Sequence, residues 1–505
     1  MTAGLAYESV RKAVSYMDSI YRRILKAAGE DGVLPADFSL GGPPASNRIR
    51  FADGAMDGIL LYHSMGQGAE ELLEHLKEIT KEASEGGSFE TLLEKLEGLF
   101  DEQDGMLSCI DGLQDWIIAN RQELSAERVF RFAEHVLTEG GEKGAVKYAL
   151  SVLELFAGTR GSWREHVRTL ALSEEFTLFC VFIARAWEDA GKELFDMAKK
   201  VRGWGRIHAV EALVPENQEM RDWLFFEGWR NEVLPSYSAV PCAVKGGLSE
   251  RLRKELLSDG EFEAAGGLLQ ALFDEGPLPG ISSEKLEDPQ GLLLSFLGHG
   301  RRRALLYSDY ETIEAVRDKA DEMGWTEARQ EAEKLLQSEE CRRELGRAMK
   351  EGLGGFALAK KLGMKYEEAL LASLDRDFSK RNVDLFLIFE AEDRELRSRA
   401  IEICERELPE SLGTGPADWS FAVDEPRYNM LGYCVQFLRR WPGEGETLVR
   451  TALLSPVINN RNMALNVLED WKGAGWQETE GIKAALQKLK ETEENEHVRE
   501  RLKTM

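Results

Sequence analysis

The chain has 505 residues, of which 43% are hydrophobic and 30% are charged, which is enough apolar material for a sizeable core and too much for a disordered chain. Its formal net charge of −26 disfavours nucleic acids and anionic membrane surfaces as partners, because both would repel it. No two of the six cysteines lie closer than 30 residues, so the sequence predicts neither a disulfide framework nor a CxxC metal motif.

No apolar signal-peptide run is visible from Met1 to Ser19. The most apolar stretch, Phe176 to Trp187, is about 12 residues long and contains Arg185. It is shorter than the ~20 residues that cross a bilayer. We therefore predict a buried core helix there and a cytoplasmic protein.

The N-terminal part, residues 1–66, differs from the rest of the chain. Tyr7 to Gly29 has the pattern of one long helix, and Asp31 to Ser46 is rich in proline and glycine and is predicted to be a loop. The segment Arg48 to His63 (RIRFADGAMDGILLYH) follows.

Helical periodicity dominates residues 67–488. Leu72, Leu73, Leu76 and Ile79 share one helix face, and short glycine-containing segments such as 85–87, 139–141, 158–161 and 472–475 are typical helix stops. Two start signals are a capping box of Ser162 with Glu165, and Asp288 before Pro289. No series of alternating strands is present, so the sequence predicts an all-α fold.

One pattern recurs along this region. The spacing R-x-x-A-x-x-x-L, which places three residues on one helix face, is found in the three copies Arg206/Ala209/Leu213, Arg397/Ala400/Cys404 and Arg461/Ala464/Leu468. It resembles the second helix of HEAT-type repeats. We therefore predict a HEAT-like array, or α-solenoid, over 67–488. We call it degenerate because the copies share no simple period. Residues 489–505 are expected to form a charged, frayed tail.

Redox and metal chemistry have only weak candidates. Gly352 to Ala357, with Asp375 and Asp377 further on, is the nearest match to a dinucleotide loop, but it follows a helix-like segment, so we favour a turn between helices. Cys109 stands in a loose likeness of a haem-thiolate loop and is interpreted as a buried structural cysteine. Glu494 with His497 is a lone E-x-x-H pair and is interpreted as a solvated helix face. No flavin, haem or metal motif is recognisable. None of the seven histidines is paired at metal-ligand spacing: His63, His75, His135, His166, His208, His299 and His497.

Two basic spots could bind a phosphate group, including that of NADPH, or could be solvated faces, which is the interpretation we favour. One is the run Arg301, Arg302 and Arg303. The other surrounds Trp204 and consists of Lys199, Lys200, Arg202 and Arg206.

Asp53 and Asp57 lie one helical turn apart. Paired carboxylates can bind a metal or transfer protons. The alternative, which we favour, is structural: Asp53 caps a helix, Asp57 lies in its first turn, and His63 is a partly buried end residue.

Asn459, Asn460, Arg461 and Asn462 form a polar group before Met463. They could cap a helix or line a recognition groove, and the sequence does not separate the two.

Two segments carry a family resemblance. Arg48 to His63 and Leu454 to Trp471 (LSPVINNRNMALNVLEDW) resemble bacterial proteins of about this length that are called limonene hydroxylases. The resemblance implies an oxidoreductase: a monooxygenase that uses NADH or NADPH to convert the monoterpene limonene to carveol or perillyl alcohol. It also implies further oxidation to carvone or perillaldehyde. It assigns no catalytic or cofactor-binding residue.

Two functional hypotheses follow. The resemblance implies a monoterpene hydroxylase with a cofactor and an apolar pocket, because oxygen activation is cofactor chemistry. The residue patterns, which contain no cofactor motif, favour a non-enzymatic helical scaffold that binds a protein or peptide along its concave face. Neither nucleic acid nor membrane is expected as a partner.

Overall fold

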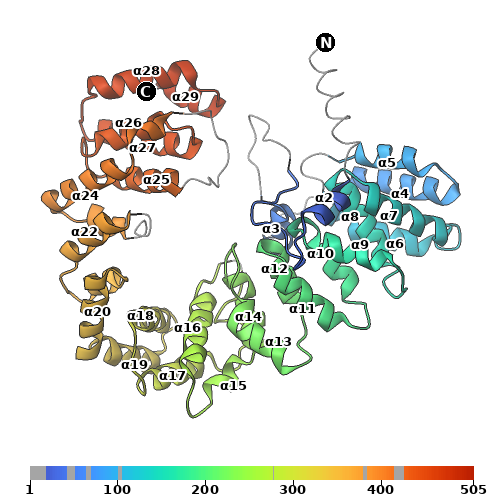
Figure 1. Ribbon diagram of the computed structural model, residues 1–505, viewed down its shortest axis with the longest axis horizontal. Helices are drawn as coiled ribbons and strands as arrows, with labels where there is room; N and C mark the ends of the chain where they lie inside the picture. Colours follow the sequence, from blue (N-terminus) through green and yellow to red (C-terminus); the bar gives the residue numbers. More distant parts are fainter. Residues whose placement is uncertain are drawn as a thin grey trace. The chain divides into compact units, whose positions relative to one another are not determined.

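The computed structural model describes residues 19–41, 52–63, 70–100, 105–276, 278–378, 384–414 and 426–504. These residues form helices joined by turns, and no β-strand occurs among them, which confirms the all-α prediction (Figure 1). They fall into two compact units, one ending at His299 and the other starting at Gly300.

The helices of the first unit run from α2 to α17. In chain order they are α2 (Ile20–Ala27), α3 (Ala55–His63), α4 (Glu70–Glu85), α5 (Phe89–Glu97), η1 (Met106–Cys109), α6 (Ile110–Ala119), α7 (Ala126–Glu139), α8 (Lys143–Glu154), α9 (Trp163–Leu170), α10 (Glu174–Ala184), α11 (Ala190–Lys200), α12 (Gly203–Ala212), α13 (Gln218–Trp223), the π-helix η2 (Leu224–Gly228), α14 (Ser236–Lys245), α15 (Leu248–Leu252), α16 (Asp259–Phe273) and α17 (Pro289–Gly300).

The second unit continues with α18 to α29. They are α18 (Tyr307–Glu322), α19 (Thr326–Leu336), α20 (Glu339–Glu351), α21 (Phe356–Lys361), α22 (Glu367–Arg376), α23 (Leu385–Phe389), α24 (Arg394–Glu407), η4 (Glu410–Gly413), α25 (Pro426–Leu438), α26 (Glu446–Leu453), α27 (Ile458–Gly473), α28 (Glu480–Thr492) and α29 (Glu496–Thr504).

Helix ends follow the sequence signals in most places. α4 stops before Gly86, whose φ is +113°, and α17 begins at Pro289, where Asp288 accepts a hydrogen bond from the Gly291 N–H at 2.9 Å. α9 does begin after Ser162, but that side chain makes no capping bond, so the expected capping box is wrong.

The described residues test part of the predictions for the N-terminal helix and loop and for the C-terminal tail. Of the helix predicted from Tyr7 to Gly29, the stretch before Ser19 lies outside the described residues, and α2 covers Ile20–Ala27. Residues 31–41 contain no helix, in agreement with the predicted loop. The tail is not frayed: α29 buries Val498 and Leu502, which pack into the core of the second unit.

A helix with apolar residues on all its faces is expected to be buried. α8 buries every residue from Gly144 to Leu153, and α10, which includes most of the stretch Phe176 to Trp187, is a core helix as predicted. Among the described residues, no helix is both long and apolar enough to cross a lipid bilayer.

Packing in the second unit is local along the chain. Each of its helices packs mainly on the next helix or the next but one, for example α25 on α26 and α27, and α26 on α28 (Figure 1). Neighbouring helices therefore bury one another's apolar faces without long-range pairing.

Buried arginines recur near helix starts. Arg397 in α24 donates to the Ala391 carbonyl at 2.5 Å and pairs with Glu444 at 2.9 Å. Arg461 in α27 donates to the Ser455 carbonyl at 2.9 Å and pairs with Glu493 at 2.8 Å. Both therefore bind a carbonyl six residues back and a carboxylate further along the chain.

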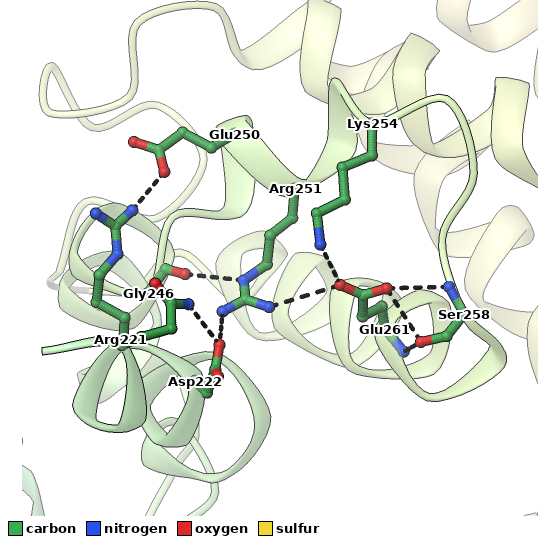
Figure 2. Close-up of polar contacts among 9 residues, drawn as sticks. Arg221, Asp222, Gly246, Glu250, Arg251, Lys254, Ser258 and Glu261 are labelled. Carbon is green, nitrogen blue, oxygen red and sulfur yellow. Dashed lines mark hydrogen bonds and ion pairs between the residues drawn. The ribbon is translucent and has the colours of Figure 1, made fainter.

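A third arginine of this kind lies in the first unit. Figure 2 shows Arg251 of α15 donating to the Gly246 carbonyl, five residues back, at 3.1 Å, and facing Asp222 and Glu261 from α13 and α16. Its guanidinium also lies 4.4 Å from the centre of the Phe225 ring in the π-helix. Of the copies expected from sequence, Arg206 differs, because it donates forward to the Glu227 carbonyl at 2.7 Å.

Candidate functional site

Two features that the sequence presents separately meet in the first unit. α3, which carries Asp53 just before it and Asp57 within it, packs against the Trp204 segment at the start of α12. α8 and α10 complete the site, because Lys147 and Glu175 project from them. We call this group of charged and aromatic residues the α3 clamp.

Ion pairs form the charged half of the clamp. The Lys147 Nζ lies 2.6 Å from Asp57 Oδ2 and 2.6 Å from Glu175 Oε1, and the Lys147 side chain is only 1% exposed. Lys143 Nζ bridges Asp53 Oδ1 at 2.8 Å and Glu175 Oε2 at 2.7 Å. Glu175 Oε2 also accepts the backbone N–H of Gly54 at 3.2 Å. The cluster thus ties the start of α3 to α8 and α10.

These contacts shift the protonation equilibria. Burial raises the pKa of Glu175, but the ammonium groups of Lys147 and Lys143 outweigh it and bring the pKa to about 2. Burial lowers the pKa of Lys143, and the Glu175 and Asp53 carboxylates reverse this and raise it. Glu175 and Lys143 therefore stay charged across the physiological range.

Glu174 behaves differently from its neighbour. Its Oε2 accepts the Trp204 N–H at the start of α12 at 3.1 Å, which favours the charged form. Burial, together with the nearby Glu232 and Asp53 carboxylates, still raises its pKa to about 7. Glu174 is thus the acid of the clamp that titrates near neutral pH.

Aromatic rings form the other half of the clamp. Tyr62 lies at ring-centre distances of 6.1 Å from Trp204, 6.0 Å from His208 and 5.2 Å from Tyr237. The His63 ring nitrogen and the Tyr237 hydroxyl share a hydrogen bond of 2.7 Å. Burial lowers the pKa of His208 to about 4, so this imidazole is neutral. The rings pack on one another as a small core.

Glycines make the close approach of α3 to its neighbours geometrically possible. A Cβ on Gly58 would lie 2.2 Å from the Trp204 ring, and one on Gly54, whose φ is +74°, would lie 2.5 Å from the Glu174 carbonyl oxygen. Only a residue without a side chain fits at either position.

The clamp corrects the expectations for Asp53 and Asp57. α3 begins at Ala55, so Gly54 and not Asp53 directly precedes it, and the expected cap at Asp53 is wrong. The Asp53 carboxylate instead accepts the Leu40 N–H at 3.1 Å and pairs with Lys143. Asp57 does lie in the first turn, but it is buried against a lysine of α8. His63 is the partly buried last residue of α3, as predicted. With its carboxylates held by lysines, the clamp is built to position α3.

The glycine-rich candidate does not fit a nicotinamide dinucleotide. Gly352 to Ala357 joins α20 to α21, so no strand precedes it. Its backbone is covered, since a Cβ on Gly354 would lie 2.7 Å from the Tyr307 ring and one on Gly355 would lie 2.8 Å from Leu345. A pyrophosphate needs that backbone exposed.

The basic spots are engaged within the chain. Arg301 pairs with Glu331, and Lys199 lies 3.3 Å from Asp196 and over the Phe195 ring. Arg206 contacts the Trp223 ring. None of these contacts tests phosphate binding, the alternative to the favoured interpretation as solvated faces.

The remaining candidates have structural surroundings. Cys109 is 1% exposed, and burial raises the pKa of its thiol, whereas Glu494 and His497 are exposed as expected. Asn460 lies inside the first turn of α27 and donates to the Tyr428 carbonyl at 3.0 Å, and Asn462 accepts from Arg501 at 3.0 Å. Since Val457 is the N-cap residue of α27, the capping interpretation of the asparagines is wrong.

An open groove lies along one face of α7 in the same unit. It measures about 800 Å³ and is lined by Phe89 of α5, by Glu127, Phe130, Arg131, Glu134, His135 and Thr138 of α7, and by His166 of α9. The six α7 residues are spaced by one, three or four positions, so they form a single helix face about three turns long. We call this the α7 groove.

The α7 groove combines an aromatic floor with an acidic rim. Phe130 packs edge-on against Phe156 and Trp163, and Phe89 packs on His135. Glu127 and Arg131 form an exposed ion pair of 2.8 Å, and Glu134 adds a further negative charge. His135 Nε2 and His166 Nδ1 are buried without a hydrogen-bond partner among the described residues.

A second, smaller hollow of about 400 Å³ lies in the other unit. Its lining includes Phe389, Phe437 and the pair Arg439–Asp470, whose closest atoms are 2.6 Å apart. Its basic groups are therefore partly neutralised within the chain. Among the described residues, no group of three or more His, Cys, Asp and Glu side chains is placed to hold a metal ion.

Sequence reasoning missed the lysines of the clamp and the α7 groove. The signal for Lys147 was present, since one lysine interrupts the apolar stretch Gly144 to Leu153, and a lysine there must find a buried partner. The groove gave a weaker signal, because Phe130 and Phe89 look like ordinary core residues of amphipathic helices.

Comparison with protein-family models, with curated proteins and with solved structures finds no match to this chain.

Proposed function

We propose that this protein is a non-enzymatic helical-repeat scaffold and that the α7 groove binds a basic protein segment carrying a large apolar side chain. The observation that carries the proposal is the groove itself: a full helix face, aromatic at its floor and acidic at its rim. Short segments docked along helices are a common mode of peptide recognition.

The scaffold half of the proposal draws on the packing. In the second unit, helices pack mainly on near neighbours in the chain, which is typical of stacked arrays. The arginines Arg251, Arg397 and Arg461 support it further, because each donates to a carbonyl five or six residues back and pairs with a carboxylate elsewhere in the chain. The same arginine arrangement at three places favours an array built from degenerate copies of one helix pair.

Charge favours a basic partner. The chain carries −26 overall, and the groove rim carries two glutamates against one arginine. A lysine or arginine would gain from this field during approach, and an aromatic or leucine side chain would cover Phe89 and Phe130. The groove length of about three turns, ~16 Å, suits one short helix of the partner.

Selection from a displayed library of random peptides tests the proposal. The purified chain is expected to enrich peptides that combine lysine or arginine with phenylalanine, tryptophan or leucine, and their binding should weaken as salt rises. Recovery of no peptide, or of acidic peptides only, would overturn it.

Monoterpene oxidation is the second candidate. The described part of the family-like segment Arg48 to His63 is the part that builds the α3 clamp, and Leu454 to Trp471 contains the buried Arg461. The resemblance therefore rests on segments with specific packing. Mass-spectrometric analysis of limonene incubated with the pure protein, oxygen, NADH and NADPH, beside a mock-purified control, tests it. Oxygenated products above control would support this candidate over the scaffold.

A further inference from the structure

Two of the cysteines lie face to face in the second unit. Cys404 of α24 and Cys434 of α25 are both fully buried, and the Cys434 thiol donates to the Cys404 sulfur over 3.6 Å. The spacing of 30 residues in sequence gave no hint of this contact. All six cysteines are free thiols in the structure.

We propose that Cys404 and Cys434 are a redox modification site, which a peroxide converts into a disulfide joining α24 to α25. Bond formation needs the sulfurs to move from 3.6 Å to the ~2.05 Å of a disulfide.

The chemistry proceeds in two balanced steps. One thiol, as its thiolate, attacks the peroxide oxygen, so that the O–O bond breaks, one water leaves and a sulfenic acid forms. The second thiol then attacks the sulfenic sulfur, forming the S–S bond and releasing a second water. Overall, one peroxide molecule accepts the two electrons that the two thiols lose, and two water molecules are released.

Geometry favours the second step strongly. The two thiols are held in contact, so the effective concentration of the resolving thiol is far above that of any thiol in solution. The hydrogen bond with Cys434, together with burial in the apolar core that includes Ala400 and Val435, raises the pKa of the Cys404 thiol. The first step is therefore slow and requires local opening of these helices. Once formed, a sulfenic acid is captured before a larger thiol can reach it.

The test is a peptide map of the native full-length chain after hydrogen peroxide treatment. Free thiols are alkylated in denaturant without reduction, and trypsin then releases residues 400–406 and 428–439, which contain Cys404 and Cys434. The expected product is these two peptides joined by a disulfide, roughly tenfold more abundant than any other linked pair. The other four cysteines should be recovered alkylated.

Two controls keep the test independent of folding. Cys404→Ser should abolish the linked peptide, and a Cys341→Ser variant, which removes another buried cysteine, should leave it unchanged. The circular dichroism of each variant checks its helix content. Absence of the linked peptide from the unmodified chain, or disulfides scattered evenly among the six cysteines, would overturn the proposal.

Discussion

At the scale of residues, the buried charge of Lys147 depends on its two carboxylate partners. Lys147 is 1% exposed and faces both Asp57 and Glu175. Such an ion pair adds little net stability compared with an apolar pair, but removing one partner leaves the other charge buried and unpaired. The lysine inside an apolar helix was visible in the sequence. Its partners, which come from α3 and α10, were not.

We expect Lys147→Met to destabilise the protein by about 3–5 kcal/mol, because Asp57 and Glu175 lose a shared buried cation. Urea unfolding followed by circular dichroism measures this. Lys95→Met is the control: Lys95 pairs with Glu82 on the surface at 2.7 Å, and its loss should cost at most about 1 kcal/mol. Equal effects of the two variants would contradict the role given to Lys147.

Glu174 and Glu175 are expected to make the stability of the folded chain change with pH in opposite directions. Its pKa in the folded chain is about 7, above the ordinary 4.5, so the folded state binds a proton more tightly than the unfolded state. The resulting destabilisation is absent below pH 4.5 and complete above pH 7. The pKa of Glu175 is lowered to about 2, so charged Glu175 stabilises the folded chain, and this stabilisation is lost only in stronger acid.

Glu174→Gln should therefore stabilise the chain at pH 8 by about 1–2 kcal/mol and have little effect at pH 4.5. Thermal unfolding of both proteins across this pH range provides the measurement. A gain that is constant with pH, or a loss at pH 8, would show that the Glu174 carboxylate is not disfavoured by its surroundings.

At the scale of elements, the positions of helices were easier to predict than their contacts. Periodicity located α4, a glycine stop located the end of α7, and the apolar stretch Phe176 to Trp187 located α10, because those signals are local in sequence. The docking of α3 depends on Trp204, about 150 residues away, and on side-chain shape, which periodicity does not encode. The charged tail was misjudged because α29 carries few apolar residues, although Val498 and Leu502 are buried and Arg501 donates to Asn462 of α27.

The close approach of α3 gives an element-scale prediction. Gly58→Ala places a Cβ within 2.2 Å of the Trp204 ring, so we expect a loss of about 1–3 kcal/mol and an altered tryptophan fluorescence spectrum. Gly346→Ala is the matched control, because no atom lies within 4 Å of its Cβ position in α20. That variant should gain about 0.5–1 kcal/mol from helix propensity.

The ion pair between Arg461, one of the recurring arginines, and Glu493 can be tested by a double-mutant cycle. Arg461→Met should cost about 3–5 kcal/mol, since it leaves Glu493 buried at 1% exposure, whereas Arg461→Met combined with Glu493→Leu should recover most of that loss. Unfolding free energies of the two single variants and the double variant complete the cycle. Additive losses would mean that the pair is not coupled.

For the whole molecule, the basic partner remains our proposal, which the net charge of −26 supports. The α7 groove could not be predicted from the sequence, because it forms only where α5, α7 and α9 come together. Its surface is formed by exposed and half-buried faces of three helices, and no sequence signature distinguishes such faces from ordinary solvated ones.

The affinity of a selected basic peptide for charge-reversed variants tests the central claim most directly. Isothermal titration would compare the unmodified chain with Glu127→Lys/Glu134→Lys in the groove and with Glu284→Lys/Glu287→Lys, an equal charge change at exposed positions of the same unit. We predict that the groove variant loses affinity by roughly tenfold or more, about 1.4 kcal/mol, while the control stays within about threefold. Equal weakening by both variants, or none by the groove variant, would contradict the proposal that the α7 groove is the binding site.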